Sequence, residues 1–177
     1  SPNGRSMKKA FLRTPGDFTR ISSKFTKSRK HPIKKVWRAH KGVDYAAPKG
    51  TNIVASGSGK IKFIGNQRGY GKVVIVDHSR GYTTLYAHMS KFASGLRKGQ
   101  RVTQGDVIGH VGMSGAATGP HLHYEFRVDG VHQNPLTMEL PMAAPISSRK
   151  MADFRHQANP LIDELNMLRS TQVADYR

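Results

Sequence analysis

Short apolar runs separated by turn-forming residues fill the middle of the chain, from about residue 40 to residue 135. The runs are two to eight residues long, and clusters of glycine, serine or asparagine such as Ser56–Gly59 divide them. Runs of this length between turn residues are typical of strands joined by tight hairpins. No helical period extends over ten residues here, so the pattern predicts a mainly β fold with an antiparallel sheet of hairpins. Strands are expected at 53–55, 60–64, 72–76, 82–86, 101–102, 107–111 and 121–128.

The segment before this core is basic and mixed in pattern. Two short apolar stretches within residues 1–39 indicate a strand or two and an approach to the main domain. The chain opens with Ser-Pro-Asn-Gly and shows no apolar signal segment, which indicates a processed piece of a longer protein. We therefore expect 1–28 to be an approach segment left from a longer N-terminal region, 29–140 the main domain, and 141–177 a linker and helix.

The pattern near residues 160–170 predicts a C-terminal helix. Asn159 is a favourable N-cap and Pro160 suits the first helical position. Leu161, Leu165 and Leu168 recur at helical spacing. We expect this helix to serve packing or tethering rather than chemistry.

The composition restricts the possible catalytic groups and metal ligands, but it does not identify a binding partner. The formal net charge is +18, and residues 1–41 hold thirteen lysines or arginines against a single acid, Asp17. Such a surface attracts polyanions in a salt-dependent way, and nucleic acid, anionic lipid and cell-wall polymer all qualify. The chain has no cysteine. Disulfides, thiolate ligands and cysteine nucleophiles are excluded, so any metal must be bound through His, Asp or Glu.

A His-x-His pair is the first candidate for that chemistry. His121 and His123 follow Gly119–Pro120 at the start of an expected strand. Residues i and i+2 of a strand project from one face, with their backbones about 7 Å apart. Taken alone, such a pair is also what two half-exposed strand histidines would look like.

A second candidate is the pair His40 and Asp44. Their spacing of four would suit one face of a helix, but Gly42, β-branched Val43 and Pro48 argue against a helix. We expect an extended or turning segment that brings the two side chains together. The simpler alternative is a surface histidine and a turn aspartate.

Two imidazoles and one carboxylate are a common ligand set of catalytic zinc, with the fourth position left for water. The ion then polarises a carbonyl and brings the pKa of water toward about 7. A further histidine beside that water can act as a base or stabilise an oxyanion. His88 and the remaining member of the His-x-His pair supply two such groups. Composition alone does not show that they converge.

The other histidines are expected to be structural. We interpret His78 as a solvated loop residue, His110 as a packed or half-buried strand residue, and His132 as a loop residue. His156 belongs to the tail. His31 either shapes the rim of a groove or only holds its loop.

Together these motifs resemble the LytM/lysostaphin-type zinc metallopeptidases. His40-x-x-x-Asp44 followed by His121-x-His123 matches the two metal motifs of that family in order and separation. The resemblance runs from about residue 29 to 136. The surrounding stretches that match are Arg38–Pro48, Gly69–Ile75, Tyr82–Ser90, Gly99–Gly112, Ser114–Gly115 and Thr118–Glu125.

The resemblance implies a LytM-type β fold, barrel-sandwich-like, with Zn²⁺ bound by His40, Asp44 and His123. It also implies that His88 and His121 flank the metal as catalytic histidines. Our hypothesis is that His121 helps to deprotonate the attacking water while His88 stabilises the oxyanion. The two roles are interchangeable at this level, because sequence does not fix which ring is nearer the water.

The stretch Gly4–Pro15 is similar to the approach segment of the MepM-like murein endopeptidases of Gram-negative bacteria. That subgroup implies cleavage of D-alanyl–diaminopimelate cross-links of peptidoglycan in the periplasm, and inhibitory or LysM-type N-terminal domains. Lysostaphin-like relatives cut glycine bridges instead, and the ligand motifs do not separate the two. The basic surface is expected to aid adsorption to the anionic envelope.

Three other functions are compatible with parts of the sequence. A non-catalytic LytM-like activator of wall hydrolases would have lost metal ligands, and here all are present. A nucleic-acid-binding protein would explain the charge but leave the histidines unexplained, and no zinc-finger or RNP pattern appears. A lipoyl-type carrier would need a modified lysine at a hairpin tip, for which there is no convincing counterpart. We therefore expect no nucleic-acid partner.

Overall fold

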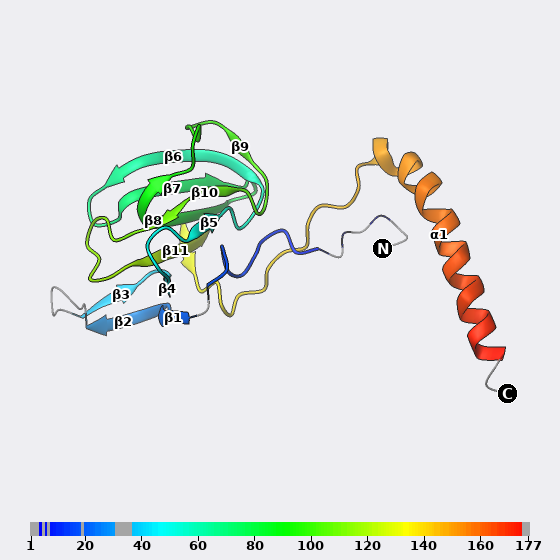
Figure 1. The fold of residues 1–177 in the computed structure, drawn as a ribbon, viewed down its shortest axis with the longest axis horizontal. Helices are drawn as coiled ribbons and strands as arrows, with labels where there is room; N and C mark the ends of the chain where they lie inside the picture. The colour runs from blue at the N-terminus through cyan, green and yellow to red at the C-terminus, as the bar shows by residue number, and fades with distance from the viewer. Residues whose placement is uncertain (1–3, 5, 7, 19, 31–36, 175–177) are drawn as a thin grey trace. The chain divides into compact units, whose positions relative to one another are not determined.

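The computed structural model describes residues 4, 6, 8–18, 20–30 and 37–174. Among them, short antiparallel strands are followed by one C-terminal helix (Figure 1), which confirms the predicted fold class. The elements are β1 (Arg20–Ser23), β2 (Thr26–Lys30), β3 (Trp37–His40), β4 (Val43–Ala46), β5 (Asn52–Val54), β6 (Gly59–Gln67), β7 (Gly71–Asp77), β8 (Tyr82–Phe92), β9 (Arg101–Val102), β10 (Val107–Val111), β11 (His121–Val128), β12 (Val131–Gln133) and α1 (Ser148–Ala174).

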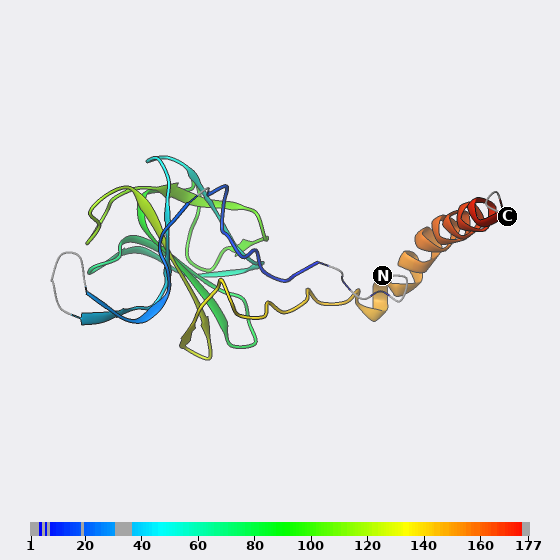
Figure 2. The ribbon, with the colours of Figure 1, turned by 90° about the horizontal axis from the view of Figure 1, so that it is seen from below.

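One large antiparallel sheet carries most of these strands. Its main path runs β1-β4-β11-β8-β7-β6-β9, while β10 pairs with β5 and β8, and β12 pairs with β11. Figure 2 shows the strands curving round a common interior. The strands β2 and β3 form a separate two-stranded sheet. Because β11 lies between β4 and β8, it is the strand on which side chains from both neighbours converge.

Each strand expected from the pattern is present, and the differences lie in strand ends and short strands. The strand β8 continues past the predicted end at residue 86 to Phe92, because β10 pairs with its second half. The segment around His40 was expected to be extended or turning, and it forms β3 and β4, which follow one another across a short turn but pair with different strands. The strand β12 was not predicted.

The core beneath β11 consists of large aromatic and aliphatic side chains. Tyr86, Tyr124 and Phe126 are fully buried, and Tyr124 packs on Tyr86 with ring centroids 5.4 Å apart. The buried hydroxyls are paired, because Tyr124 Oη donates to Ser56 Oγ at 2.9 Å and Ser56 N donates to Tyr86 Oη at 2.8 Å. Paired hydroxyls avoid the cost of burying a polar group without a partner.

The chain divides into two compact units. Phe11–Leu140 form one unit, which contains the twelve strands found among the described residues, and Ser1–Ala10 with Pro141–Arg177 form the other. In the second unit Ala10 N donates to Pro141 O, and Ala143 N donates to Lys8 O, both at 2.8 Å. The N-terminal segment is thus tied to the residues that precede α1.

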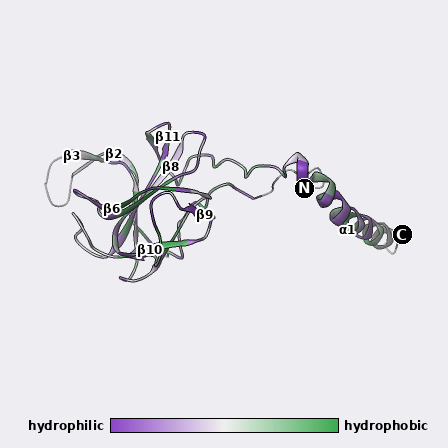
Figure 3. Ribbon diagram, turned by 90° about the horizontal axis from the view of Figure 1, so that it is seen from above, coloured by the Kyte–Doolittle hydropathy of each residue, from purple (hydrophilic) through white to green (hydrophobic). Residues whose placement is uncertain are grey.

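The predicted start of the C-terminal helix is wrong. The helix begins at Ser148, and Pro160 lies inside it rather than at its first position. The residues before Asn159 include the good helix formers alanine, methionine, arginine and glutamine, so they extend the helix toward the N-terminus. Figure 3 shows α1 as mainly hydrophilic with scattered apolar positions. Over the described residues, no helix combines the length and apolar character needed to cross a membrane.

Candidate metal centre and active site

The strand β11 places the His-x-His pair directly beside β4. Their register puts His123 opposite Asp44 and His121 opposite Ala46. Directly opposite residues of an antiparallel pair project from the same face, so His123 and Asp44 share one space. On its other side His123 stands opposite Ala87 of β8, whose small side chain leaves room above the sheet.

His40 reaches the same space through the short turn between β3 and β4. Gly42 in this turn lies against β11, and a Cβ there would stand 2.6 Å from Tyr124 O and 2.7 Å from His123 Cε1. Real Cβ atoms do not approach that closely, so only glycine allows the turn to pack on the His123 ring. This close approach turns His40 back toward Asp44.

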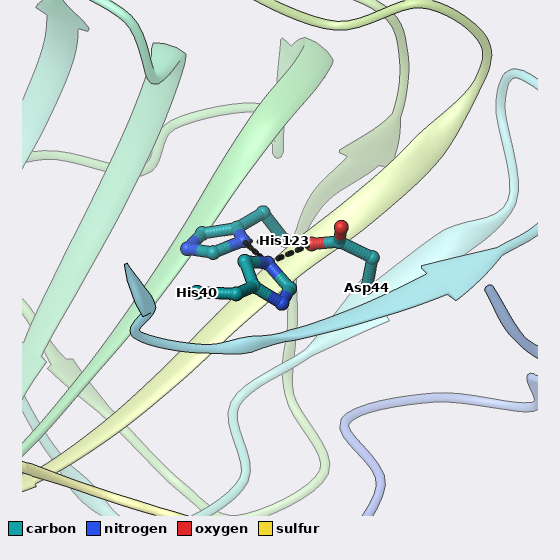
Figure 4. A group of neighbouring side chains, drawn as sticks. All are labelled: His40, Asp44 and His123. Atoms are coloured by element: carbon teal, nitrogen blue, oxygen red, sulfur yellow. Dashed lines mark hydrogen bonds and ion pairs between the residues drawn. The ribbon is translucent and has the colours of Figure 1, made fainter. Parts of the chain in front are cut away.

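Three side-chain atoms meet at the centre of the site (Figure 4). His40 Nε2 lies 2.9 Å from Asp44 Oδ1 and 3.2 Å from His123 Nδ1, and His123 Nδ1 lies 2.7 Å from Asp44 Oδ1. All three residues are buried, and they form a group able to hold a metal ion. Ligands of tetrahedral zinc at about 2.0–2.1 Å stand about 3.3 Å apart, so a small outward movement would accommodate the ion.

The opposite nitrogen of each ligand imidazole is held by the protein. His40 Nδ1 is 2.9 Å from the carbonyl oxygen of Lys24, and His123 Nε2 is 3.1 Å from Glu125 Oε1. Both partners only accept hydrogen bonds, so these nitrogens carry the protons. In the neutral rings the lone pairs are then on His40 Nε2 and His123 Nδ1, the two nitrogens that face Asp44, and without a metal ion a proton added at either nitrogen can be donated to the carboxylate. The donor set therefore suits a cation.

The remaining two predicted histidines flank this centre. His121 Nδ1 is 2.8 Å from Gly119 O, and His88 Nδ1 is 2.7 Å from Ser114 O. Each ring thus donates from Nδ1 and keeps a lone pair on Nε2. The two ring centroids are 4.7 Å apart, and His121 Nε2 is 4.0 Å from Asp44 Oδ1.

His88 reaches the site through an unusual backbone conformation. Strict alternation along β8 would place it on the face of Tyr86, which is the core face. Its φ is 61°, in the left-handed region that costs a non-glycine residue about 1–3 kcal/mol. The pairing of β8 with both β7 and β10 is irregular beside it. This irregularity turns the His88 ring toward His121.

A pocket of about 730 Å³ surrounds all five predicted residues. Its wall also includes Tyr70, Lys41 and Arg68. The carboxylates of the wall, Asp44 and Glu125, are engaged by His123 and Arg127, which leaves the two cations to attract an anionic ligand. The structure therefore brings the five predicted side chains to one pocket. Which of them bind metal and which act in catalysis stays a prediction.

Most of the residues that line this pocket lie within a segment that matches a known protein family. Residues 38–135 match the family model "Peptidase family M23". The chain belongs to peptidase family M23. The match includes all three residues of the candidate metal centre, the two flanking histidines and the whole of β6 to β11.

Several known M23-like proteins are similar to this chain. It is 44% identical over 163 residues to the peptidoglycan DD-endopeptidase ShyC of Vibrio cholerae, covering 92% of this chain and 37% of the relative. It is 50% identical over 124 residues to the DD-carboxypeptidase/endopeptidase Mpg of Neisseria meningitidis, covering 70% and 28%. The chain thus spans about a third of the length of these relatives.

A solved structure gives the same picture of the fold. The crystal structure of a zinc-containing peptidase from Vibrio cholerae matches with a TM-score of 0.70 at 33% identity. The match covers 80% of this chain and 46% of that one. The LytM-type M23 fold is therefore confirmed.

Electrostatics at the M23 centre favour a bound cation. Burial raises the pKa of Asp44, but hydrogen bonds from His123 and His40 outweigh it and hold this pKa far below its usual value. Burial lowers the pKa of His123, yet its hydrogen bonds to Asp44 and Glu125 raise the net value to about 9. Burial lowers the pKa of His88 to about 4. A positive charge is thus strongly held between His123 and Asp44, while His88 is neutral near pH 7.

One residue of the site escaped the sequence analysis. Glu125 is 1% exposed and accepts hydrogen bonds from His123 and from Tyr70. Burial raises its pKa, but the hydrogen bonds from His123 and Tyr70 outweigh it and give about 2. A signal was available, because Glu125 continues the alternation of His121 and His123 along one face of β11.

Two expectations about the other histidines are wrong. His78 lies in a loop as expected, but it is half-buried rather than solvated, since its ring nitrogens contact Ser58 O at 2.9 Å and Thr84 Oγ1 at 2.7 Å. Its ring also packs edge-on against Phe11, and burial lowers its pKa. His132 was expected in a loop, but it lies in β12, because pairing with β11 extends the sheet there.

The remaining histidines lie away from the centre or outside the described residues. His110 is partly buried on β10, with Nδ1 3.2 Å from Gly50 O, so the half-buried strand interpretation is confirmed. His156 is exposed on α1. His31 lies outside the residues that the structure describes, so its role stays a prediction.

Proposed function

We propose that this chain is a zinc-dependent endopeptidase that hydrolyses peptide cross-links of bacterial peptidoglycan, with the D-alanyl–diaminopimelate bond as its target. The observation that carries the proposal is the convergence of three buried ligand atoms and two further histidines in one pocket. The names of ShyC and Mpg support the substrate, and membership of family M23 supports peptide-bond hydrolysis.

The proposed ligands are His40 through Nε2, Asp44, and His123 through Nδ1. Their chemistry fits zinc, because two neutral imidazoles and one carboxylate leave a dipositive ion with net positive charge and an open position. When bound, Zn²⁺ supplies a Lewis acid that polarises the scissile carbonyl and brings the pKa of water toward about 7.

The flanking histidines are proposed to move the protons. In His121 and His88 the Nδ1 proton is committed to a main-chain carbonyl, so Nε2 is free to take a proton from the attacking water. We assign this base role to His121, since its Nε2 lies 4.0 Å from Asp44 Oδ1. His88 is then left for the oxyanion that forms on the substrate carbonyl, a role that requires a proton on its Nε2 in addition to the one that Nδ1 donates to Ser114 O. The symmetric hydrogen bonding of the two rings keeps the exchanged assignment as the alternative.

The pocket wall supports an anionic substrate over a neutral one. Lys41 and Arg68 line the pocket, and the carboxylates there are Asp44 and the buried Glu125. Diaminopimelate carries a carboxylate next to the scissile amide, whereas glycine bridges carry none. Attraction to that carboxylate favours DD-endopeptidase activity over cleavage of glycine bridges.

We further propose that the protein works in the cell envelope, in the periplasm, where its substrate lies. Electrostatic attraction between the basic surface and the anionic envelope would assist adsorption, and should weaken with salt. The division into 1–28, 29–140 and 141–177 stays a prediction, as do inhibitory or LysM-type domains elsewhere in the same protein.

Digestion of purified muropeptides tests the proposed activity. The zinc-loaded chain should convert D-alanyl–diaminopimelate cross-linked dimers to monomers, with the mass of one water added per cleavage. A chelator should stop the reaction and zinc should restore it. Release of terminal D-alanine from monomers would indicate carboxypeptidase activity instead, as in the first part of the name of Mpg. No amide cleavage in either substrate would favour a non-catalytic activator of other wall hydrolases.

A further inference from the structure

A buried carboxylate lies behind the metal centre with both oxygens occupied. Glu125 Oε1 accepts from Tyr70 Oη at 2.6 Å and from His123 Nε2 at 3.1 Å. Its Oε2 accepts from Arg127 Nε at 2.9 Å and from His132 Nε2 at 3.0 Å. The guanidinium also contacts Oε2 through Nη2. These contacts join a proposed metal ligand to the pocket wall and to the partner strand β12.

The charge of this group determines which way the hydrogen bonds run. A buried carboxylate is costly without compensation, and Arg127 supplies a permanent positive charge beside it. An ionised carboxylate only accepts, so His123 must carry its proton on Nε2. The lone pair of the neutral ring then belongs to Nδ1, which faces His40 and Asp44.

The two proposed ligand imidazoles differ in the group that fixes the tautomer of the ring. His40 donates from Nδ1 to the neutral carbonyl of Lys24, whereas His123 donates to a charged carboxylate. A charged acceptor fixes the ring more strongly and raises its basicity as a ligand. Glu125 is also shared with Tyr70, whose ring lies near His123 with centroids 5.8 Å apart.

We propose that Glu125 is a positioning residue that fixes the tautomer and orientation of His123, and through it the affinity of the site for zinc. By accepting from Tyr70 as well, Glu125 holds that side chain in the pocket wall. The inference rests on the proposed function only in taking His123 as a zinc ligand. The competing explanation is an ion pair with Arg127 that merely stabilises β11.

Replacement of Glu125 by glutamine separates these explanations. In Glu125→Gln the amide must direct its NH₂ group toward either Arg127 or His123. Toward His123 it favours the tautomer with the proton on Nδ1, which opposes metal binding. Zinc affinity, measured by competition with a chromophoric chelator, should fall about 10–100-fold. The matched control Glu139→Gln changes an exposed glutamate of the same unit and should bind zinc like the unchanged chain.

A spectroscopic measurement gives an independent readout. Nitrogen-15 NMR of the zinc-loaded unchanged chain should show His123 with its proton on Nε2. In Glu125→Gln the signals should shift toward a mixture of tautomers. Unfolding of both chains with urea in the presence of chelator reports the structural contribution separately. Lower stability with unchanged zinc affinity and an unchanged tautomer would overturn the proposal.

Two further outcomes are also decisive. If Glu125→Gln does not fold, the NMR spectrum of the unchanged chain decides, and a proton on Nδ1 of His123 would overturn the inference. If the unchanged chain binds zinc but cleaves no muropeptide, the proposed function fails while the role of Glu125 in zinc affinity is still tested by the chelator competition.

Discussion

The two faces of β11 show how one strand serves both chemistry and stability. One face carries His121, His123 and Glu125, which make hydrogen bonds to main-chain or charged partners. The other face carries Leu122 and Tyr124, both fully buried in the core. Successive residues therefore face environments that differ in polarity, although the same backbone holds both.

The comparison shows that a rigid apolar face is what positions the polar one. The pairing of β11 with β4 and β8 fixes the register of the strand, and packing of its apolar side chains in the aromatic core fixes its position relative to that core. The backbone that carries the polar side chains is therefore held in place without contributions from those side chains. Changes to the two faces should consequently have separable effects, on metal and turnover in one case and on unfolding in the other.

The largest effect is expected on the polar face at Asp44. Asp44→Ala removes a charged ligand, so zinc affinity should fall by more than the roughly 100-fold loss expected for an outer supporting group. Muropeptide cleavage should become undetectable. Chelator competition measures the affinity, and Asp153→Ala, an exposed residue of α1, is the control. Unchanged affinity in Asp44→Ala would remove it from the ligand set.

Loss of a flanking histidine should affect turnover alone. His121→Ala should reduce the rate of muropeptide cleavage by about 10²–10⁴-fold, the usual contribution of a general acid or base. Zinc should stay bound, since His123 and Asp44 are untouched. Steady-state cleavage rates with metal analysis test this, with His110→Ala on β10 as the control. Normal turnover would exclude His121 as the base.

The apolar face should respond in the opposite way. Leu122→Ala leaves a cavity in the core, so the free energy of unfolding should fall by about 2–5 kcal/mol. Zinc affinity per folded molecule should change little. Urea denaturation measures the loss, and Leu161→Ala, exposed on α1, should stay within about 0.5 kcal/mol. A loss of zinc affinity without a loss of stability would contradict the separation of the two faces.

The smallest effect should be a stability maximum of the metal-free chain near pH 6.5. The pKa of His123 is raised to about 9, so its stabilising contribution is complete below 6.5 and is lost as the pH rises through 9. The pKa of His88 is lowered to about 4, so the unfolded chain takes up a proton that the folded chain refuses as the pH falls from 6.5 toward 4.

Urea denaturation in the presence of chelator at pH 4.5, 6.5 and 9 measures this profile. Bound zinc should remove the alkaline decline, because the metal replaces the proton on His123. His88→Ala should flatten the acid side. Stability that rises steadily from pH 6.5 to 9 without metal would show that Asp44 and Glu125 do not hold the His123 proton.

The alternation of polar and apolar residues along β11 could be predicted from the sequence, and so could the residue types of the site. The turn residues that bound each run restrict the chain to short strands, and a His-x-His pair in a strand must share a face. The same alternation extends to Glu125, whose importance the sequence analysis missed. The presence of a helix was also predictable from the spacing of its leucines. Its start was not, because Asn159–Pro160 looks like a helix start, whereas the helix begins at Ser148.

Tertiary structure alone decided which groups meet. Asp44 and His123 are opposite one another because β4 and β11 pair, and the register of strands so distant in sequence depends on the packing of the whole sheet. His88 joins them only because neighbouring strands hold its backbone at φ 61°, a conformation that local preference disfavours. His78 is half-buried for a similar reason, since Phe11 from a distant segment packs against its ring. Local sequence determines which face a side chain takes, whereas the pairing energy of the whole sheet determines what lies across from it.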